Sequence, residues 1–371
     1  MTNKHLELKR NHHSVWAHYL KGWSPDGSNV FSTTRSKKII FDSVKMLTVE
    51  RDFYKVCVLT DEHLSCIRGV SKLSPIHLHN SHMQELDSYL QVQLAQLKSV
   101  DEGYCSEDSE RVFLAWAHNS MENQHAQHEL EVREIVRSLA CRDLSVLEKD
   151  NNMLLFMQFI GQQVARTKVF KRSSIERLSL SEVASVREHA RLFQECWWFM
   201  HYMFGMSIAY SLFFERGLFS NTLLINGASE SFITSDQPVI NIHPALDLGG
   251  ENLSGKECDF YYPVSPKVAY IISRSGRYSS GVVEASEELV LELNEKMAKS
   301  ALVNIISDNE RALKSTENTS AECCRFGLIN FSMSKYRMFF HRIVLTESVA
   351  GLRQQTFSRR ILIVRRSLAL L

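Results

Sequence analysis

The chain has 371 residues, of which 44% are hydrophobic and 23% are charged. This composition is typical of a globular protein with its own hydrophobic core and excludes an intrinsically disordered chain. Its 43 basic residues nearly balance its 42 acidic residues. The chain as a whole therefore offers no basic surface, and a nucleic-acid partner would have to use a local patch.

Eight cysteines are scattered along the chain without a Cys-x-x-Cys pair or a zinc-like spacing. Residues 1–10 lack the apolar core of a signal peptide. Together these features predict a cytoplasmic protein with reduced thiols. We interpret the vicinal pair Cys323-Cys324 as two buried small hydrophobes, with oxidation as the alternative.

Histidines and aromatic residues cluster at residues 11–20, which read Asn-His-His-Ser-Val-Trp-Ala-His-Tyr-Leu. On a strand, His12 and His13 would face opposite sides, so only one of them could point into a given site. The turn signal Pro25-Asp26-Gly27 follows, and β-branched and aromatic positions after it predict a strand or hairpin over residues 29–40.

Residues 81–217 contain no proline, and their apolar residues recur at helical spacing. This pattern predicts a helical middle. Its last segment, residues 196–214, has about the length of a membrane span, roughly 20 residues. However, it is strongly aromatic and contains His201 among small polar residues, which favours a buried central helix.

Two groups of histidines stand out before and within this middle. His118, Glu122, His125 and Glu129 would share one helix face, with His128 nearby, and that spacing suits metal ligands. A solvated polar face is the alternative that we favour. A second group could supply two strand ligands, although a loop at the start of a helix explains it better. The second group is His77, His79 and His82.

Short strands are predicted after the helical middle, at residues 222–227, 232–234, 261–266 and 268–273. A helix is expected from residue 286 to 307. The fold class is therefore α+β, with a helical middle packed against short strands from the N-terminal and C-terminal parts. We expect one domain over residues 1–310 and a C-terminal extension over 311–371. Its basic and apolar tail suits an edge strand or a disordered end, or alternatively contact with a membrane or nucleic acid.

Four segments form an ordered series of motifs: residues 11–20, Phe-Ile-Gly-Gln-Gln-Val-Ala-Arg-Thr at 159–167, Phe-Ile-Thr-Ser-Asp-Gln-Pro-Val at 232–239, and Tyr-Pro-Val-Ser-Pro at 262–266. In this order they resemble the family catalogued as domain of unknown function 4238. Trp16 and Lys168 stand where that family usually has proline. The resemblance implies an intracellular, mostly microbial protein of unassigned function, and it supplies no catalytic mechanism.

The motif residues suggest a catalytic set of His12, His13, Arg166 and Asp236. A histidine would serve as acid, base or ligand, Asp236 as base or ligand, and Arg166 as a clamp for a phosphate or carboxylate. Substrate contacts would come from neighbouring polar residues of the same motifs. These are Gln163, Thr234 and Ser235. Alternatively, Asp236 caps a turn and Arg166 is a buried structural residue that bonds backbone carbonyls.

Such a set would form a histidine-assisted or metal-assisted hydrolytic site for a phosphodiester. We therefore expect a nuclease-like or phosphodiesterase-like effector, in a toxin or anti-phage setting, with nucleic acid or another phosphate-bearing ligand as partner. A divalent metal is a cofactor that these ligand types allow. The alternatives are a non-catalytic binding or regulatory module, in which the motifs lock strands onto helices, and an enzyme for a small organic substrate. No phosphate-binding glycine loop or serine-hydrolase motif is present.

Overall fold

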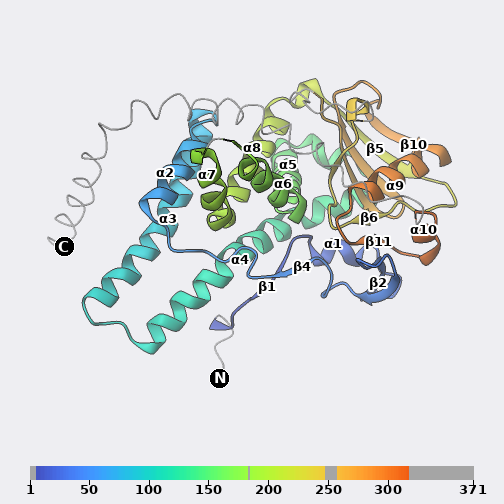
Figure 1. Cartoon of the computed structure of the whole chain (residues 1–371). Helices are drawn as coiled ribbons and strands as arrows, with labels where there is room; N and C mark the ends of the chain where they lie inside the picture. The colour runs from blue at the N-terminus through green and yellow to red at the C-terminus, as the bar shows by residue number, and fades with distance from the viewer. Residues whose placement is uncertain (1–5, 183, 247–256, 317–371) are drawn as a thin grey trace.

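The computed structural model describes residues 6–182, 184–246 and 257–316 (Figure 1). Helix makes up 54% and strand 16%, and the helices separate from the sheets, which confirms the predicted α+β class. The long helices lie consecutively in the middle of the chain. They are α2 (Asp61–Ser71), α3 (Ile76–Asp101), α4 (Glu107–Ala140), α5 (Asp150–Ala165), α6 (Lys168–Ser179), α7 (Ala184–Glu195) and α8 (Trp197–Phe214).

The strands of the described residues form three sheets. The largest has the order β10-β5-β9-β8-β7, in which only β10 and β5 run parallel. Its strands are β5 (Ser220–Asn226), β7 (Ile240–Asn241), β8 (Phe260–Ser265), β9 (Val268–Ser273) and β10 (Gly281–Ala285). The strands expected near residues 222, 261 and 268 are thus confirmed.

The four-stranded sheet joins the two ends of the described chain. Its order is β3-β2-β11-β6, all antiparallel. The hairpin expected after Pro25 is confirmed as β2 (Asn29–Thr33) and β3 (Ile39–Ser43), while β6 (Thr234–Ser235) and β11 (Ile305–Ser307) come from the far end of the chain. Short antiparallel strands β1 (Asn11–His13) and β4 (Val49–Arg51) pair alongside, and α1 (Ala17–Lys21) follows β1.

Helices α5 and α8 cross closely because glycines meet at the contact. A Cβ atom on Gly161 would collide with the carbonyl oxygen of Gly205, and one on Gly205 would collide with the Gln162 side chain. Larger residues would separate the helices and disturb a close-packed core. The crossing fixes the direction of α5 and hence the place of Arg166, which immediately follows its last residue.

The buried central helix expected at 196–214 is confirmed as α8, most of whose residues are buried, His201 included. Among the described residues, none of the helices has both the length and the apolar character that a bilayer crossing requires. The histidine group at 77–82 lies in the first turns of α3 and not on a strand. Most of the expected extension, from residue 317, and the Cys323-Cys324 pair lie outside the described residues.

The predicted helix over residues 286–307 is wrong at its C-terminal end. Helix α9 covers Glu287–Ser300, and Ala301 is already extended. The backbone N–H groups of Leu302, Val303 and Asn304 bind the Asp236 carboxylate instead of helical carbonyls. The residues that follow then form β11. Long-range pairing therefore overrides the apolar periodicity that suggested helix.

Candidate functional site

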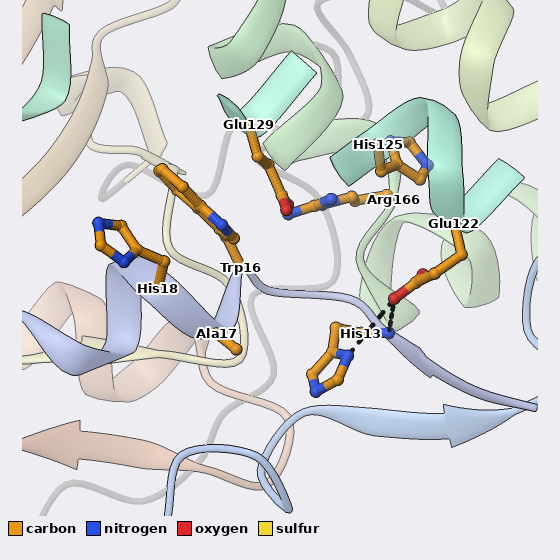
Figure 2. Close-up of a pocket in the computed structure, with 8 residues that line it drawn as sticks. All are labelled: His13, Trp16, Ala17, His18, Glu122, His125, Glu129 and Arg166. Carbon is orange, nitrogen blue, oxygen red and sulfur yellow. Dashed lines mark hydrogen bonds and ion pairs between the residues drawn. The ribbon is translucent and has the colours of Figure 1, made fainter. Parts of the chain in front are cut away.

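A cavity of about 230 Å³ lies where the end of β1 and the start of α1 meet the middle of α4 and the end of α5 (Figure 2). Two carboxylates, three imidazoles and one guanidinium line it, together with an indole. The lining residues are His13, Trp16, Ala17, His18, Glu122, His125, Glu129 and Arg166. This polar pocket joins the first two sequence motifs to the polar face predicted on α4.

His13 reaches the pocket because strand alternation separates it from His12. Its Nδ1 lies 3.4 Å from Glu122 Oε1 (Figure 2). Its Nε2 lies 3.3 Å from the Lys45 carbonyl oxygen. Both neighbours are acceptors, so both ring nitrogens are suited to donate. The hydrogen bond with Glu122 raises the pKa of His13 above its ordinary value, against the opposing effect of burial. The pocket therefore stabilises the imidazolium form of His13 more than water does.

His12 points the other way and is fully buried. Its Nε2 lies 2.7 Å from the Lys9 carbonyl and 2.9 Å from the His118 carbonyl, while its Nδ1 accepts a 2.8 Å hydrogen bond from the Tyr54 backbone N–H. One tautomer, protonated at Nε2, satisfies all these groups. His12 thus joins the N-terminal strand to its neighbours and does not line the pocket.

Arg166 and Glu129 form a buried ion pair at the base of the pocket. Arg166 Nη2 donates to Glu129 Oε1 at 2.6 Å, and Arg166 is only 1% exposed. Burial raises the pKa of Glu129, and the guanidinium opposes that effect. Because the desolvation of two charges offsets much of their attraction, such a pair adds little stability by itself. It does hold a cation at a fixed place beside the cavity.

A chain of hydrogen bonds fixes the tautomer of His125. His201 Nδ1 lies 2.8 Å from the Trp197 carbonyl, so it carries the proton and leaves His201 Nε2 as an acceptor. His125 Nε2 lies 2.9 Å from that acceptor and must be its donor. In this tautomer His125 Nδ1 carries an unshared electron pair. Burial lowers the pKa of His125 well below its ordinary value and that of His201 to about 3, so both rings stay neutral.

The Tyr54 ring packs against the hydrogen-bonded pair of His125 and His201. Its ring lies 5.0 Å from that of His125, 4.6 Å from that of His201 and 5.6 Å from that of His12, between ring centroids. Its hydroxyl donates to the Arg166 carbonyl at 3.0 Å. Tyr54 therefore connects the His125–His201 pair to the backbone of Arg166.

Buried polar atoms remain without partners around the pocket. Within the described residues, Glu122 Oε2 and Arg166 Nε have no hydrogen-bond partner although both are shielded. An unbonded buried polar group costs about 1–3 kcal/mol, and native proteins rarely leave one without a purpose. These two atoms indicate that the pocket is suited to a polar ligand or to bridging water.

At the edge of the pocket, Trp16 packs on His18 with ring centroids 4.9 Å apart. Burial lowers the pKa of His18, and the nearby cations Arg133 and Lys21 lower it further. Both cations are exposed. A buried indole and two exposed cations thus lie close to the polar cavity.

Asp236 lies in a different environment and does not line the pocket. Its Oδ1 accepts from the Leu302 N–H at 2.9 Å, and its Oδ2 accepts from those of Val303 and Asn304 at 2.7 and 3.1 Å. Burial raises its pKa, and these three donors oppose that effect. The carboxylate organises the turn that leads from α9 into β11.

The proposed substrate-contact residues are also outside the pocket lining. Ser235 Oγ bonds within its own turn, donating to the Gln237 carbonyl at 3.0 Å and accepting from the Gln237 N–H. Gln163 is buried on α5, one turn before Arg166. Thr234 Oγ1 lies 2.7 Å from the Tyr19 hydroxyl, which also lies 2.6 Å from the Pro263 carbonyl oxygen. Thus the first, third and fourth motifs meet at one buried tyrosine.

The structure therefore divides the predicted residues into two groups. It brings His13 and Arg166 together with Glu122, His125 and Glu129, which the helical spacing had placed on one face. His118 belongs elsewhere, with its Nδ1 2.9 Å from Asp52 Oδ1 but not in hydrogen-bonding geometry. In the part of the chain that the structure describes, no three His, Cys, Asp or Glu side chains are arranged to hold a metal ion.

Sequence reasoning missed the second layer of the pocket, Tyr54 and His201. His201 had a usable signal, because a histidine in an otherwise apolar buried helix needs hydrogen-bond partners. Tyr54 gave no signal beyond its aromatic character. Trp16 was noted only as a departure from the family motif, yet it lines the pocket.

Comparisons with family models, with curated proteins and with solved structures gave no match to this chain.

Proposed function

We propose that the pocket is the active site of a phosphodiesterase that works by histidine acid–base catalysis, with RNA as its substrate. One observation carries this proposal: two histidines hold opposite chemical roles in one cavity, beside a buried arginine. His13 faces acceptors on both ring nitrogens, whereas the tautomer of His125 leaves Nδ1 as an acceptor. Environments that separate two titratable groups in this way are typical of acid and base pairs.

The geometry suggests a division of labour. His125 Nδ1 would accept the proton of a ribose 2′-hydroxyl, whose oxygen attacks the neighbouring phosphorus. His13, protonated and bonded to Glu122, would donate a proton to the departing 5′-oxygen. Arg166 has N–H groups in addition to the one that bonds Glu129, and its charge would stabilise the negative phosphoryl oxygens. This mechanism requires a 2′-hydroxyl, which is why we favour RNA over DNA.

The surroundings of the pocket support a nucleic-acid substrate. Arg133 and Lys21 are exposed close to His18, where they could contact flanking phosphates. Trp16 lines the pocket but is only 7% exposed, so the two cations would supply the contacts outside the cavity. These contacts are local, in agreement with a chain that has almost no net charge. From the four ordered motifs we also propose a relationship to domain of unknown function 4238 and a role in a toxin or anti-phage setting.

The test is cleavage of single-stranded RNA in the presence of EDTA. We expect wild-type protein to produce fragments with 2′,3′-cyclic phosphate ends, and His13→Gln and His125→Asn to lower the rate by about 10²–10⁴-fold, the usual contribution of acid–base catalysis. His77→Gln is the matched control, because His77 is exposed at the start of α3 and lies outside the pocket. Its rate should equal that of the wild type.

Two results would overturn this proposal. One is the absence of any cleavage of RNA by the correctly folded wild-type protein. The other is cleavage that His13→Gln and His125→Asn leave unchanged. If RNA binds in a manner that depends on Arg166 but is not cleaved, the second candidate is favoured. That candidate is a non-catalytic binding module, and the observation behind it is the buried bonding of Tyr19 and Asp236, which locks strands together.

A further inference from the structure

Helices α3 and α4 form an arm whose far end lies outside the hydrophobic core. The buried residues of α3 end at Tyr89, and those of α4 begin at Ala115. We call the intervening residues, 90–114, the arm end. In Figure 1 the arm end projects away from the other helices and from the sheets. It therefore contributes to the surface of the molecule and not to its core.

The arm end carries a connected group of exposed apolar side chains. Leu94 is 53% exposed, Leu97 47%, Val100 53%, and Tyr104, in the turn after α3, 77%. Successive members lie three or four positions apart, so on α3 they are neighbours on the helix surface. Single exposed hydrophobic residues are ordinary, whereas a connected group indicates a surface that binds another segment.

The same surface is negatively charged. Residues 98–111 contain five acidic and two basic side chains, a net charge of −3. Asp101 follows Leu97 by four positions and Leu94 by seven, which places it on their face of α3. Asp101 and Glu107 are both exposed, and neither has an ion-pair partner among the described residues. The arm end thus suits a segment that is both apolar and basic.

This chain carries such a segment outside the described residues, at 359–371. Eight of its thirteen residues are apolar, four are arginines and none is acidic, which gives a net charge of +4. Ile361, Val364, Leu368 and Leu371 recur at intervals of three and four, the intervals that relate the apolar residues of the arm end. We propose that the arm end is the docking surface for residues 359–371 of the same molecule. This proposal is independent of the proposed RNA cleavage.

The length of the intervening chain permits this contact. Residues 317–358 connect the described part of the chain to the basic segment. Fully extended, they could span roughly 140 Å, several times the radius of gyration of about 21 Å expected for a compact chain of this length. Because the segment is tethered to the molecule that carries the arm, its effective concentration exceeds that of a separate partner.

RNA would satisfy this segment less completely than the arm end does. Phosphates would neutralise the four arginines, but they would leave the eight apolar side chains uncovered. The arm end offers acidic groups and apolar side chains together. An anionic membrane offers both as well, so vesicles and RNA are included as competing partners in the tests.

The first test is photo-crosslinking in the full-length protein. Tyr104 is replaced by the photoreactive analogue p-benzoylphenylalanine, and the irradiated protein is digested and analysed by mass spectrometry. We expect cross-links to peptides from residues 359–371 in a product with the mass of one chain. The control places the same analogue at Phe214, which is also aromatic and 61% exposed but packs on His77 at the opposite end of α3. It should give no such cross-link.

Three results of this experiment would overturn the proposal. The first is the absence of cross-links from position 104 to residues 359–371. The second is an equal yield from position 214. The third is a product with the mass of two chains, which would assign the docked segment to a second copy.

A matched pair of variants then tests the apolar contact. Trypsin cleaves after the arginines of the segment, and docking should slow that cleavage. Leu97→Glu should therefore accelerate release of the peptides from 359–371 several-fold relative to wild type. Leu130→Glu is the control, because Leu130 is 54% exposed on the same arm but lies beyond the arm end, inside the buried part of α4. Its cleavage rate should equal that of the wild type.

Equal rates in wild type and Leu97→Glu would contradict docking on this face. Protection from trypsin that appears only after RNA or anionic phospholipid vesicles are added would also overturn the proposal, in favour of that added partner.

The acidic contribution has its own pair of variants. Asp101→Lys should lower the cross-linking yield from position 104, and 0.5 M salt should lower it in the unsubstituted arm, because exposed charges are screened. Asp87→Lys introduces the same charge change at an exposed position of α3 before the arm end and should leave the yield unchanged. An equal loss in both variants would mean that the overall charge of the protein, and not the arm end, attracts the segment.

Discussion

The pocket beside Arg166 and the turn around Asp236 both contain buried charged side chains, but the bonds of those side chains differ. Asp236 accepts three backbone N–H groups and thereby closes the turn between α9 and β11. Around the pocket, Glu122 Oε2 and Arg166 Nε stay unbonded within the described residues, and a cavity separates the side chains. At Asp236, the carboxylate finds its hydrogen-bond donors within the protein. In the pocket, unused donor and acceptor atoms are left that a ligand can bond.

This difference teaches how to weigh polar motif residues. Residue type and motif membership made Asp236 and Arg166 look equivalent, because each can serve a hydrolytic site. The discriminating property is the number of hydrogen bonds that the protein itself leaves unmade, since a fully bonded carboxylate has little left to offer a substrate. The comparison predicts that changes near Asp236 affect stability alone, whereas changes in the pocket affect ligand chemistry even when stability is preserved.

The largest expected effect is the loss of stability in Asp236→Ala. Three buried backbone N–H groups lose a charged acceptor, so we expect the free energy of unfolding to fall by about 4 kcal/mol, given about 1–3 kcal/mol for each unsatisfied group. Urea denaturation monitored by circular dichroism measures it. Asp236→Asn keeps one amide oxygen as acceptor and should lose less. If Asp236→Ala remains as stable as wild type but loses pocket activity, the distinction between the two regions fails.

The next largest effect concerns the buried ion pair. Arg166→Met should lower the free energy of unfolding by about 3 kcal/mol, because Glu129 is left buried without its partner. The double variant Arg166→Met/Glu129→Leu should recover most of that loss, since an apolar pair of similar volume replaces both charges. A urea-denaturation double-mutant cycle measures the recovery.

The recovered double variant then separates stability from function. It should have near wild-type stability and still fail to cleave or bind RNA, because the cation is gone. Wild-type activity in this stable double variant would mean that Arg166 is a structural residue and that the pocket resembles the Asp236 turn.

Much of the fold could be predicted because local signals agreed with long-range packing. Helical spacing without proline predicted a helical middle over residues 81–217, though not its division into α6, α7 and α8. Turn signals with β-branched residues predicted β2, β5, β8 and β9. Prediction failed at residues 305–307, where apolar periodicity continued but the chain turned to pair with β2 and β6. The local sequence pattern holds no information about the distant Asp236 carboxylate, which accepts hydrogen bonds from the N–H groups that follow α9.

The pocket was predictable only in parts. His13 and Arg166 were identified from motifs, and Glu122, His125 and Glu129 from their helical spacing, but as two separate sets. What unites them is the packing of β1 and the end of α5 against α4, and this tertiary arrangement leaves no periodic trace in the sequence. The divergence of His12 and His13 was predictable, because strand geometry alone determines it.

The smallest expected effect tests whether Glu122 sets the charge of His13. Since the folded-state pKa of His13 is raised above the ordinary 6.5, its contribution to stability is fully present below pH 6.5 and is lost as pH rises through the folded-state pKa. Glu122→Gln removes the charge that raises this pKa. The difference in urea midpoint between wild type and Glu122→Gln should therefore shrink as pH rises from about 6 to 8. His125 and His201, whose pKa values are lowered, destabilise both proteins alike below pH 6.5 and cancel in the difference. A difference that stays constant over this range would mean that Glu122 leaves His13 neutral, and His13 would then not be the acid of the proposed reaction.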